Sequence, residues 1–409
     1  MTEAAVDRHV VIVGASLAGT RTAQNLRVLG HTGRVTLVGA EAELPYDRPP
    51  LSKRLLQGEW SEAAAQEIRL ATQEELDERE VELRLGSAAV GLDSAARLVQ
   101  LADGTSVPYD ALVIATGAAA RPSPWRPPSG VYQLRTLNDS RAIAARLALG
   151  EPVVVVGGGF IGTEIAAAAV GYGCPVTIVD PLPEPMARLV GPEIAGSLVE
   201  LHRRNGVRTR FGTGVVAIEG KAGELTVELA SGERLAASTT VVGIGSVPST
   251  DWLADSGLKL DNGVVTDRFL RASGADDVYA IGDVARWPHP GRGVDVRAEH
   301  WTNASDQAMY VATALTRGVE AGYEPTDYVW SDQYDWKVNT FGWRDPAGSS
   351  TVIGDLQADS RAAVIHTDAQ GAACGAVTVN WVRALNQARR LLAAGASSDS
   401  VVDTIRQLA

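Results

Sequence analysis

Two glycine-rich turns in this sequence have a spacing suited to holding phosphate groups. They are Gly14-Ala-Ser-Leu-Ala-Gly19 and Gly157-Gly-Gly-Phe-Ile-Gly162, and each directly follows a run of valine and isoleucine. Such turns place free backbone N–H groups and the positive end of a helix dipole beside an anion. Acidic residues follow, Glu41 and Asp180, which can accept hydrogen bonds from ribose hydroxyls. Each turn therefore predicts a dinucleotide site.

A tight turn without a ligand is the alternative for both sites. It carries more weight for the first turn, where Ser16 replaces the middle glycine that lets the backbone approach a pyrophosphate. The context of each turn favours binding, because a strand precedes it and a helix and a second strand follow. The first helix is expected to end near Leu29, with Gly30 as its C′ residue. The second strands are Val35–Val38 and Val176–Val179.

Two copies of strand, glycine turn, helix and strand predict an α/β fold with two Rossmann-like dinucleotide-binding domains. Each copy is followed by alternating apolar and polar residues, at 81–113 and 215–229, which predict a meander or hairpin. Strands that stop at glycines then follow, Ala115-Thr116-Gly117 and Gly243-Ile-Gly245. A further strand starting at Val278 leads to Asp283.

The composition changes from about Tyr323 onward, and seven of the nine tryptophans lie after position 250. This change predicts a separate C-terminal α/β domain. The expected boundaries are 1–117 with 245–321 for a discontinuous first dinucleotide domain, 118–244 for the second, and 322–409 for the C-terminal domain.

Charge and hydropathy exclude several classes of function. The chain has 37 Lys and Arg against 49 Asp and Glu, a net charge of −12, which argues against nucleic-acid binding. Its N-terminus lacks the basic start of a signal peptide. The apolar stretch 153–176 contains Glu164, Pro175 and several glycines, so it is expected to form a strand, a turn and a buried helix. We expect a cytoplasmic protein without membrane attachment.

The two cysteines, Cys174 and Cys374, lie far apart in the sequence. This spacing argues against a disulfide framework, a CxxC zinc site, an iron–sulfur cluster within the chain and a close redox dithiol. His289 and His300 form no pattern typical of metal ligands, so no metal site is predicted.

Two dinucleotides in one chain favour hydride transfer between a nicotinamide and a flavin. The carboxylate of Asp180 would repel a 2′-phosphate, which favours NADH over NADPH. Arg188 is the alternative, since it could curl back toward a 2′-phosphate.

Longer motifs add a family resemblance that spans essentially the whole chain. The chain resembles the FAD-dependent NAD(P)H:ferredoxin reductases of oxygenase and P450 systems, the group of putidaredoxin reductase and the biphenyl dioxygenase reductases, which have the glutathione reductase-like fold. Besides the two turns, the segments that carry it are Pro45-Tyr-Asp-Arg-Pro-Pro-Leu-Ser-Lys53, Ala115-Thr-Gly117, Gly243-Ile-Gly245, Tyr279-Ala-Ile-Gly-Asp283 and Trp330-Ser-Asp-Gln-Tyr-Asp335. The Pro-Pro-Leu-Ser-Lys and Trp-Ser-Asp-Gln segments are far more specific than the glycine turns.

The resemblance implies which residues hold the cofactors. Those assigned to FAD are Gly14, Ser16, Gly19, Glu41, Arg48, Lys53, Val90, Ala115, Thr116, Gly117, Arg135, Gly245, Asp283 and Trp301. Those assigned to NADH are Gly157, Gly159, Gly162 and Asp180, with Glu164 facing the nicotinamide. Lys53 and Glu164 would be the catalytic residues, paired near the isoalloxazine ring.

Each assigned side chain also has a purely structural alternative. Lys53 could be a solvated surface lysine, Glu164 a first-turn acid that stabilises a helix dipole, and Asp283 an N-cap for a following helix. Trp330 could be a core residue rather than part of an electron-transfer path.

The resemblance implies an electron route outward to a small iron–sulfur ferredoxin that serves a cytochrome P450 or a Rieske-type oxygenase. Disulfide reductases of this fold have a CxxxxC after the second strand, but residues 44–58 contain no cysteine. The alternatives are an NADH dehydrogenase with quinone-like acceptors and a redox-responsive flavoprotein resembling apoptosis-inducing factor. We expect a monomer or a weak homodimer. Candidate residues for docking an acidic ferredoxin are Arg317, Lys337, Arg344, Arg383, Arg389 and Arg390.

Overall fold

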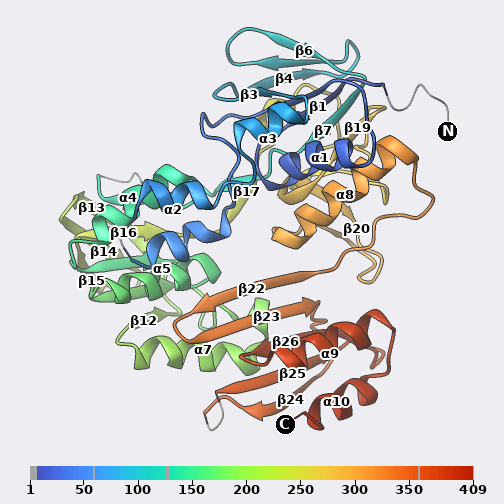
Figure 1. The fold of residues 1–409 in the computed structure, drawn as a ribbon. Coiled ribbons are helices and arrows are strands. Elements are labelled where there is room, and N and C mark those ends of the chain that lie inside the picture. Colours follow the sequence, from blue (N-terminus) through green and yellow to red (C-terminus); the bar gives the residue numbers. More distant parts are fainter. Residues whose placement is uncertain (1–6, 59, 126–128, 358–359, 409) are drawn as a thin grey trace. The chain divides into compact units, whose positions relative to one another are not determined.

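The computed structural model of the chain describes residues 7–58, 60–125, 129–357 and 360–408 (Figure 1). These residues form two compact units. Unit 1 comprises the chain through Asp47 together with Gln66–Ala119 and Ser246–Thr326. Unit 2 comprises Arg48–Ala65, Ala120–Gly245 and the chain from Asp327 onward. The three predicted domain boundaries remain predictions.

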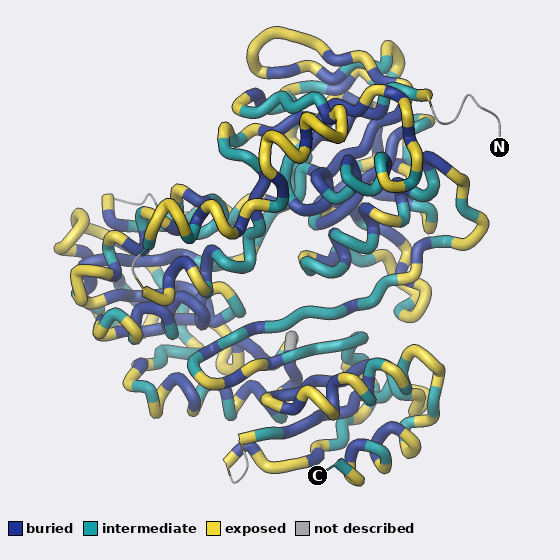
Figure 2. Tube along the Cα trace, viewed as in Figure 1, coloured by how far each residue is buried: buried dark blue, intermediate teal, exposed yellow. Residues whose placement is uncertain are grey.

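Unit 1 is built on a parallel five-stranded sheet in the order β19-β7-β1-β2-β3. All four residues of the central strand are buried, because both faces of the sheet are covered (Figure 2). The strands are β1 (Val10–Val13), β2 (Val35–Val38), β3 (Val81–Arg84), β7 (Ala111–Ile114) and β19 (Val278–Ala280).

Alternate residues of these strands enter two different cores. Val10 and Ile12 pack with helices α1 (Leu17–Val28) and α8 (Trp301–Arg317). Val11 and Val13 pack with a three-stranded antiparallel meander on the other face. The meander consists of β4 (Ala89–Asp93), β5 (Leu98–Leu101) and β6 (Ser106–Pro108).

The predicted meander over 81–113 is therefore too long at both ends. Residues 81–84 and 111–114 pair in parallel with β2 and β1, so they belong to the central sheet. Alternation alone does not distinguish a strand of a parallel sheet from a strand of an antiparallel meander. The remaining elements of unit 1 are α3 (Gln73–Glu78), β8 (Ala118–Ala120), β17 (Ser246–Pro248), η4 (Asp251–Leu253), β18 (Val264–Val265), η5 (Gly282–Val284), β20 (Ala285–Pro288) and β21 (Asp295–Val296).

Unit 2 repeats the same plan with a second parallel sheet, in the order β12-β11-β10-β16-β9. Val153 and Val155 pack with helices, whereas Val154 and Val156 pack with a second antiparallel meander. The strands of the sheet are β9 (Val131–Tyr132), β10 (Val153–Val156), β11 (Val176–Asp180), β12 (Arg208–Phe211) and β16 (Thr239–Val242). The helices are α4 (Leu137–Leu147) and α5 (Phe160–Gly171), and the meander is β13 (Val215–Lys221), β14 (Glu224–Leu229) and β15 (Arg234–Ala237).

The C-terminal part of unit 2 is an antiparallel sheet in the order β22-β23-β26-β25-β24. Its strands are β22 (Tyr328–Gln333), β23 (Trp336–Gly342), β24 (Ser350–Asp355), β25 (Arg361–Thr367) and β26 (Ala373–Val379). One face packs against α7 (Pro192–Arg204), which follows the short α6 (Ala187–Val190). The other face packs against α9 (Val382–Ala393) and α10 (Ser398–Arg406). The predicted α/β fold of the C-terminal part is confirmed, whereas its predicted start at residue 322 stays a prediction.

The segment after Asp47 belongs to unit 2 and carries η2 (Pro49–Leu51), η3 (Arg54–Leu56) and α2 (Glu62–Glu67). Leu56 is fully buried in the core of the second parallel sheet, and the guanidinium of Arg141 lies over the ring of Trp60. Of the helices in the described parts of the chain, none has the length and apolar character needed to cross a membrane.

Candidate functional site

The first glycine turn is shaped by backbone contacts that leave no room for larger residues. Gly14 has a φ of +120°, and a Cβ there would collide with the carbonyl oxygen of Ala115. A Cβ on Gly19 would collide with the carbonyl oxygen of Gly14. Ser16, the N-cap residue of α1, is half-buried. Backbone therefore packs directly against backbone in this turn, and the N-terminus of α1 is suited to an anion.

The polar groups around this turn come from several strand ends of the first sheet. Glu41 follows β2 and accepts a hydrogen bond from the Tyr46 hydroxyl. The Thr116 hydroxyl donates to the Ser249 carbonyl over 2.9 Å. In parallel sheets ligands bind at these carboxyl ends.

Asp283 lies within η5, after β19, and is half-buried. The N-cap alternative for this residue is wrong, because Ile281 caps η5 and strand β20 follows it. The N–H of Gly282 donates to the buried side-chain oxygen of Gln307, 2.7 Å away, which ties this turn to α8. Trp301 begins α8, and its indole N–H donates to Asp47 over 2.8 Å.

The second glycine turn has the same closure in unit 2. A Cβ on Gly157, which has a φ of +113°, would collide with the Gly243 carbonyl, and a Cβ on Gly162 with the Gly157 carbonyl. A Cβ on Gly159 would meet nothing within 4 Å. The middle glycine therefore leaves open space in front of the helix N-terminus, which suits a pyrophosphate.

Asp180 ends β11 beside this turn, and backbone groups hold both of its carboxylate oxygens. One oxygen accepts from the N–H of Gly158 over 2.7 Å and the other from the N–H of Leu182 over 2.8 Å. Arg188, the alternative ligand for a 2′-phosphate, is an exposed residue of α6.

A buried charge pair lies one turn into the helix that follows the second glycine turn. Glu164 is 4% exposed, and its carboxylate forms an ion pair with the ammonium of Lys53, whose side chain is 14% exposed. Ser52 donates to the other carboxylate oxygen, Oε2, over 2.5 Å. Ser331 of β22 donates to Oε1, also over 2.5 Å. Three donors from two distant segments therefore hold this carboxylate.

The sequence around Lys53 explains how a loop residue reaches a helix of the second domain. Pro49 and Pro50 begin the 3₁₀ turn η2, where their fixed φ suits the first helical positions. Leu51 and Leu55 are buried, and the Ser140 hydroxyl of α4 donates to the Leu51 carbonyl over 2.9 Å. The segment is therefore anchored on both sides of Lys53.

These contacts decide two of the structural alternatives. Lys53 is not a solvated surface lysine, because it is mostly buried and paired. Glu164 is not a first-turn acid acting on the helix dipole, since it lies in the second turn and its carboxylate is occupied by side-chain donors. The expected Lys53–Glu164 pair is present.

Further polar residues stand behind the pair. Gln333 donates from Nε2 to Ser331 Oγ over 3.1 Å and lies 2.9 Å from Nε2 of His202. The Tyr334 hydroxyl lies 3.1 Å from the other ring nitrogen of His202. Burial lowers the pKa of His202 and raises the pKa of Tyr334, while the hydrogen bond with Gln333 partly offsets the shift of the histidine.

The other predicted cofactor residues occupy varied places. The Arg48 guanidinium donates to the carbonyl of Arg135 in unit 2. Gly245 has a φ of +99°, and its carbonyl accepts from the Arg121 N–H. Val90 of unit 1 is 54% exposed and lies at a bulge of β4, where the pairing with β5 shifts. Each unit thus assembles its own set, and the assignment of these residues to cofactors stays a prediction.

The motifs assigned no role to four residues that surround the buried ion pair or stand behind it, namely Ser52, Ser331, Gln333 and His202. Ser52 and Ser331 lie within the two specific motifs, so the motifs themselves were the available signal. Gln333 ends the Trp-Ser-Asp-Gln segment, and its burial follows only from its inward position in β22. No sequence pattern marked His202, which comes from α7.

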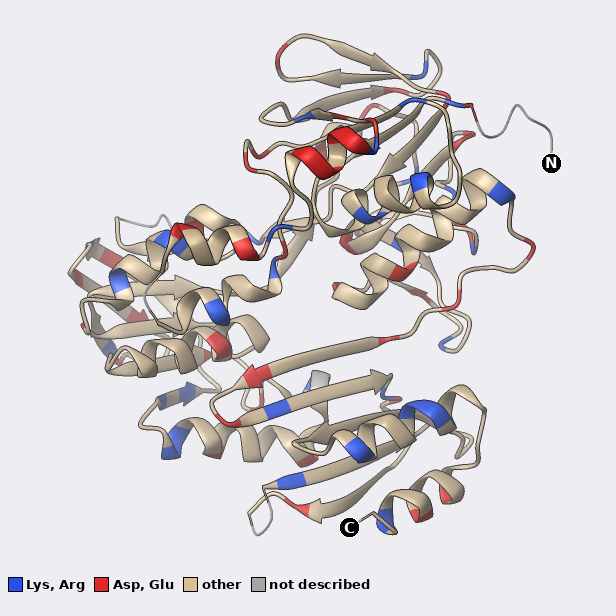
Figure 3. Ribbon diagram, in the orientation of Figure 1, with Lys and Arg blue, Asp and Glu red and all other residues tan. Residues whose placement is uncertain are grey.

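The basic candidates for partner docking are divided between the units. Arg317 ends α8 in unit 1, whereas the other candidates belong to unit 2. Arg383, Arg389 and Arg390 belong to helix α9. Figure 3 shows basic residues along this helix. Arg389 lies over the rings of Tyr328 and Phe341. Trp330 is half-buried in β22 and stacks on Tyr328.

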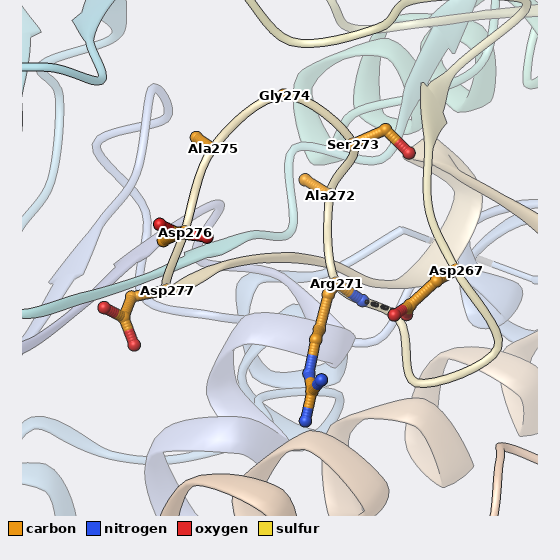
Figure 4. Close-up of a pocket in the computed structure, with 8 residues that line it drawn as sticks. All are labelled: Asp267, Arg271, Ala272, Ser273, Gly274, Ala275, Asp276 and Asp277. Atoms are coloured by element: carbon orange, nitrogen blue, oxygen red, sulfur yellow. Dashed lines mark hydrogen bonds between the residues drawn. The ribbon is translucent and has the colours of Figure 1, made fainter.

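One open depression of unit 1 contains none of the predicted site residues (Figure 4). Two of its acidic side chains, Asp267 and Asp277, have structural partners within the unit. Asp267 accepts from the N–H of Arg271 over 3.0 Å, and Asp277 pairs with Arg8 and Arg97. Within the described ranges, no three His, Cys, Asp or Glu side chains are grouped so as to hold a metal ion.

Comparison with known proteins agrees with this arrangement over nearly the whole chain. Residues 8–308 match the family described as pyridine nucleotide-disulphide oxidoreductase, and residues 328–406 match the reductase C-terminal domain. The ferredoxin–NAD(+) reductase component of the anthranilate 1,2-dioxygenase system of Burkholderia cepacia is 38% identical, with 95% of each chain covered. Rhodocoxin reductase of Rhodococcus erythropolis is 37% identical over 94% of this chain and 89% of its own length.

A solved structure adds a likeness in three dimensions. The crystal structure of a covalent putidaredoxin reductase–putidaredoxin complex matches with a TM-score of 0.89 and 32% identity, covering 94% of this chain and 93% of the other. The resemblance drawn from the motifs is thus confirmed. The chain belongs to the pyridine nucleotide-disulphide oxidoreductase family, within its group of flavin-dependent NAD(P)H:ferredoxin reductases.

Proposed function

We propose that this protein takes a hydride from NADH and passes the electrons singly, through FAD, to a small iron–sulfur ferredoxin that serves a cytochrome P450 or a Rieske-type oxygenase. The relatives' names support the ferredoxin, since one belongs to a dioxygenase system and another was crystallised with putidaredoxin. The balance per turnover is one NADH and two oxidised ferredoxins to one NAD⁺, two reduced ferredoxins and one proton.

The main observation in support of this proposal is that the segment after strand β2 contains a paired lysine and no cysteine. Thiol-dependent members of this fold need cysteines there, and residues 44–58 have Lys53, paired with Glu164, and no cysteine. Cys174 lies in the connection between α5 and β11, and Cys374 lies in β26. Burial raises the pKa of both thiols. A thiol held protonated is a poor nucleophile, so a thiol relay is disfavoured.

The two turns fit two dinucleotides by their shape. Both have backbone approaches that exclude a Cβ at the first and last glycines, and both open at the N-terminus of a helix. When bound, FAD would supply the step from two-electron to one-electron transfer. The protein's own part is to hold the pyrophosphates by backbone N–H groups and to keep the Lys53 ammonium fixed by Glu164.

We also propose that NADH is preferred over NADPH. Asp180 presents a carboxylate at the end of β11, and its two hydrogen bonds to backbone N–H groups hold it in place. A fixed negative charge at the position of the adenosine ribose would repel a 2′-phosphate. The preference should appear as a higher kcat/KM for NADH.

The test is an anaerobic titration of the flavin-loaded protein with NADH in the presence of a [2Fe-2S] ferredoxin. We expect bleaching of the flavin followed by bleaching of two ferredoxins per NADH. Flavin reduction without ferredoxin reduction would contradict the proposal that a ferredoxin accepts the electrons. Fast turnover with quinones alone would favour an NADH dehydrogenase, and slow reduction coupled to a change in oligomeric state would favour a redox-responsive flavoprotein.

A second experiment addresses the docking surface. Replacing Arg317, Lys337 and Arg344 with glutamate should raise the KM for ferredoxin and leave dye reduction by NADH unchanged, because surface charges guide the association of proteins. An equal fall in both activities would contradict this docking assignment.

A further inference from the structure

We infer that the inward-facing half of the Trp330-Ser-Asp-Gln segment positions the Glu164 carboxylate: Ser331 holds it, and Gln333 and His202 orient the Ser331 hydroxyl. This inference rests on the proposed function, in which the Lys53–Glu164 pair assists hydride transfer. It gives the C-terminal domain a part in the chemistry besides any part in partner docking.

The alternation of strand β22 separates two sets of side chains in this segment. Ser331 and Gln333 are both 0% exposed, whereas Trp330 and Asp332 are half-exposed. Successive side chains of a strand point to opposite faces, so the serine and the glutamine share the inner face. The same four residues therefore present one pair to the interior of unit 2 and another pair outward.

The inner pair belongs to a chain of hydrogen bonds that ends at Glu164. Ser331 Oγ lies 2.5 Å from Glu164 Oε1, and Gln333 Nε2 lies 3.1 Å from Ser331 Oγ. Gln333 Oε1 lies 2.9 Å from Nε2 of His202, and the Tyr334 hydroxyl lies 3.1 Å from Nδ1 of the same ring. Three segments contribute to it: helix α5, helix α7, and strand β22 with the turn residue that follows it.

The direction of every bond follows from what each group can donate. An ionised carboxylate only accepts, so Ser331 must donate to Glu164, and its oxygen then accepts from the Gln333 amide. The Gln333 carbonyl oxygen faces His202, so the ring must carry its proton on Nε2. A neutral ring then accepts at Nδ1 from Tyr334. The low pKa that burial gives His202 agrees with a neutral ring.

In this chain of hydrogen bonds, every group therefore donates to the next group in the direction of the Glu164 carboxylate. Hydrogen bonds to a charged group are stronger than those between neutral groups, and those in a dry interior reinforce one another. Ser331 shares Oε1 with the Lys53 ammonium, while Ser52 holds Oε2. Without Ser331, the carboxylate can rotate and draw the ammonium with it, so the position of Lys53 becomes less defined.

The kinetic test compares substitutions in the flavin-loaded protein by anaerobic stopped-flow reduction with NADH. Ser331→Ala should lower the limiting rate of flavin reduction about tenfold, ~1.4 kcal/mol, and leave the Kd for NADH within about twofold. Ser331→Thr retains the hydroxyl and should recover most of the rate. The matched control is Thr378→Val, which removes another hydroxyl that is 0% exposed in the same sheet and should leave the rate unchanged.

A second readout does not depend on activity. In protein labelled with ¹⁵N-histidine, the His202 signal, assigned with His202→Gln, should show a proton on Nε2 and none on Nδ1 at neutral pH. A ring without a proton on Nε2 could not donate to the Gln333 carbonyl oxygen, which would reverse the hydrogen bonds between His202 and Ser331 and overturn the inference. This measurement on the unmodified protein decides the question even where Ser331→Ala does not fold.

The outcomes separate this inference from the proposed function. If Ser331→Ala reduces its flavin as fast as the unmodified protein while Glu164→Gln is slow, the inference is wrong and the role of the charge pair stands. If Glu164→Gln is also fast, the charge pair has no catalytic part and the inference falls with it. A protein whose flavin NADH does not reduce contradicts the proposed function itself.

Discussion

The two glycine turns are near copies in backbone, but the helices that follow them differ in the side chain two residues after the last glycine. Gly14 and Gly157 have φ values of +120° and +113°, and Gly19 and Gly162 each abut the carbonyl of the first glycine. Two residues after the last glycine, the first helix has Arg21 and the second has Glu164. Arg21 is half-exposed and donates to Gln24 over 2.9 Å. Glu164 is buried and receives three side-chain donors.

The fold therefore builds the same glycine turn twice, but a buried ion pair stands in the helix after only the second turn. A repeated βαβ unit needs its glycines for backbone packing, so the glycines of both copies are constrained alike. The position inside the helix is free to vary with what packs against it. In unit 2 the loop with Lys53 and strand β22 pack there, and both contribute donors to Glu164.

The largest expected effect comes from introducing a side chain at the last glycine of each turn, one turn at a time. Gly19→Val should yield protein without FAD, because the new side chain collides with the Gly14 carbonyl. Gly162→Val should keep FAD and weaken NADH binding about a hundredfold, ~3 kcal/mol. Flavin absorbance per protein and the Kd for NADH measure the two effects.

Gly171→Val is the control for those variants, since a Cβ there meets nothing within 4 Å. It should retain both cofactors. Loss of FAD from Gly162→Val with NADH binding intact would mean that the two turns are assigned to the wrong cofactors.

The next largest effect concerns the position at which the two helices differ. Glu164→Gln should slow flavin reduction by NADH about ten- to a hundredfold, because hydrogen bonds to a charged group are lost and Lys53 loses its counter-ion. Arg21→Gln at the corresponding position of α1 should change the rate by less than about twofold. Equal losses in the two variants would show that the helices contribute alike.

A smaller effect is expected at the acid after the second turn. Asp180→Asn removes the negative charge with little change in size, so the ratio of kcat/KM for NADPH to that for NADH should rise about tenfold, ~1.4 kcal/mol. Glu41→Gln in unit 1 is the comparison and should leave this ratio unchanged. A ratio that stays constant in Asp180→Asn would place the selectivity elsewhere, with Arg188 as the first residue to examine.

The smallest effect is expected from giving the first turn the middle glycine of the second turn. Ser16→Gly restores the middle glycine of the first turn, and glycine differs from serine at an N-cap by only a few tenths of a kcal/mol. The Kd for FAD should therefore change by less than about twofold. A much tighter complex would show that the serine side chain obstructs the pyrophosphate.

Local patterns predicted most of the parallel sheets. Short β-branched runs that end in glycine specify strands and turns through nearby residues, and Gly30 does end α1 with a φ of +89°. The predicted extent of the first meander is wrong, because β3 and β7 pair with strands of the parallel sheet that are distant in the sequence. Alternation cannot show which partner a strand will choose.

The sequence by itself determined the two glycine turns, the family and the absence of cysteines beside Lys53, because these follow from residue types at fixed spacing. Only the tertiary structure decided what surrounds the Glu164 carboxylate. Ser52, Ser331 and His202 come from a loop, a strand and a helix that are remote in the chain. Their meeting depends on packing within unit 2, and burial turns polar residues that the motifs leave without a role into a directed set of donors.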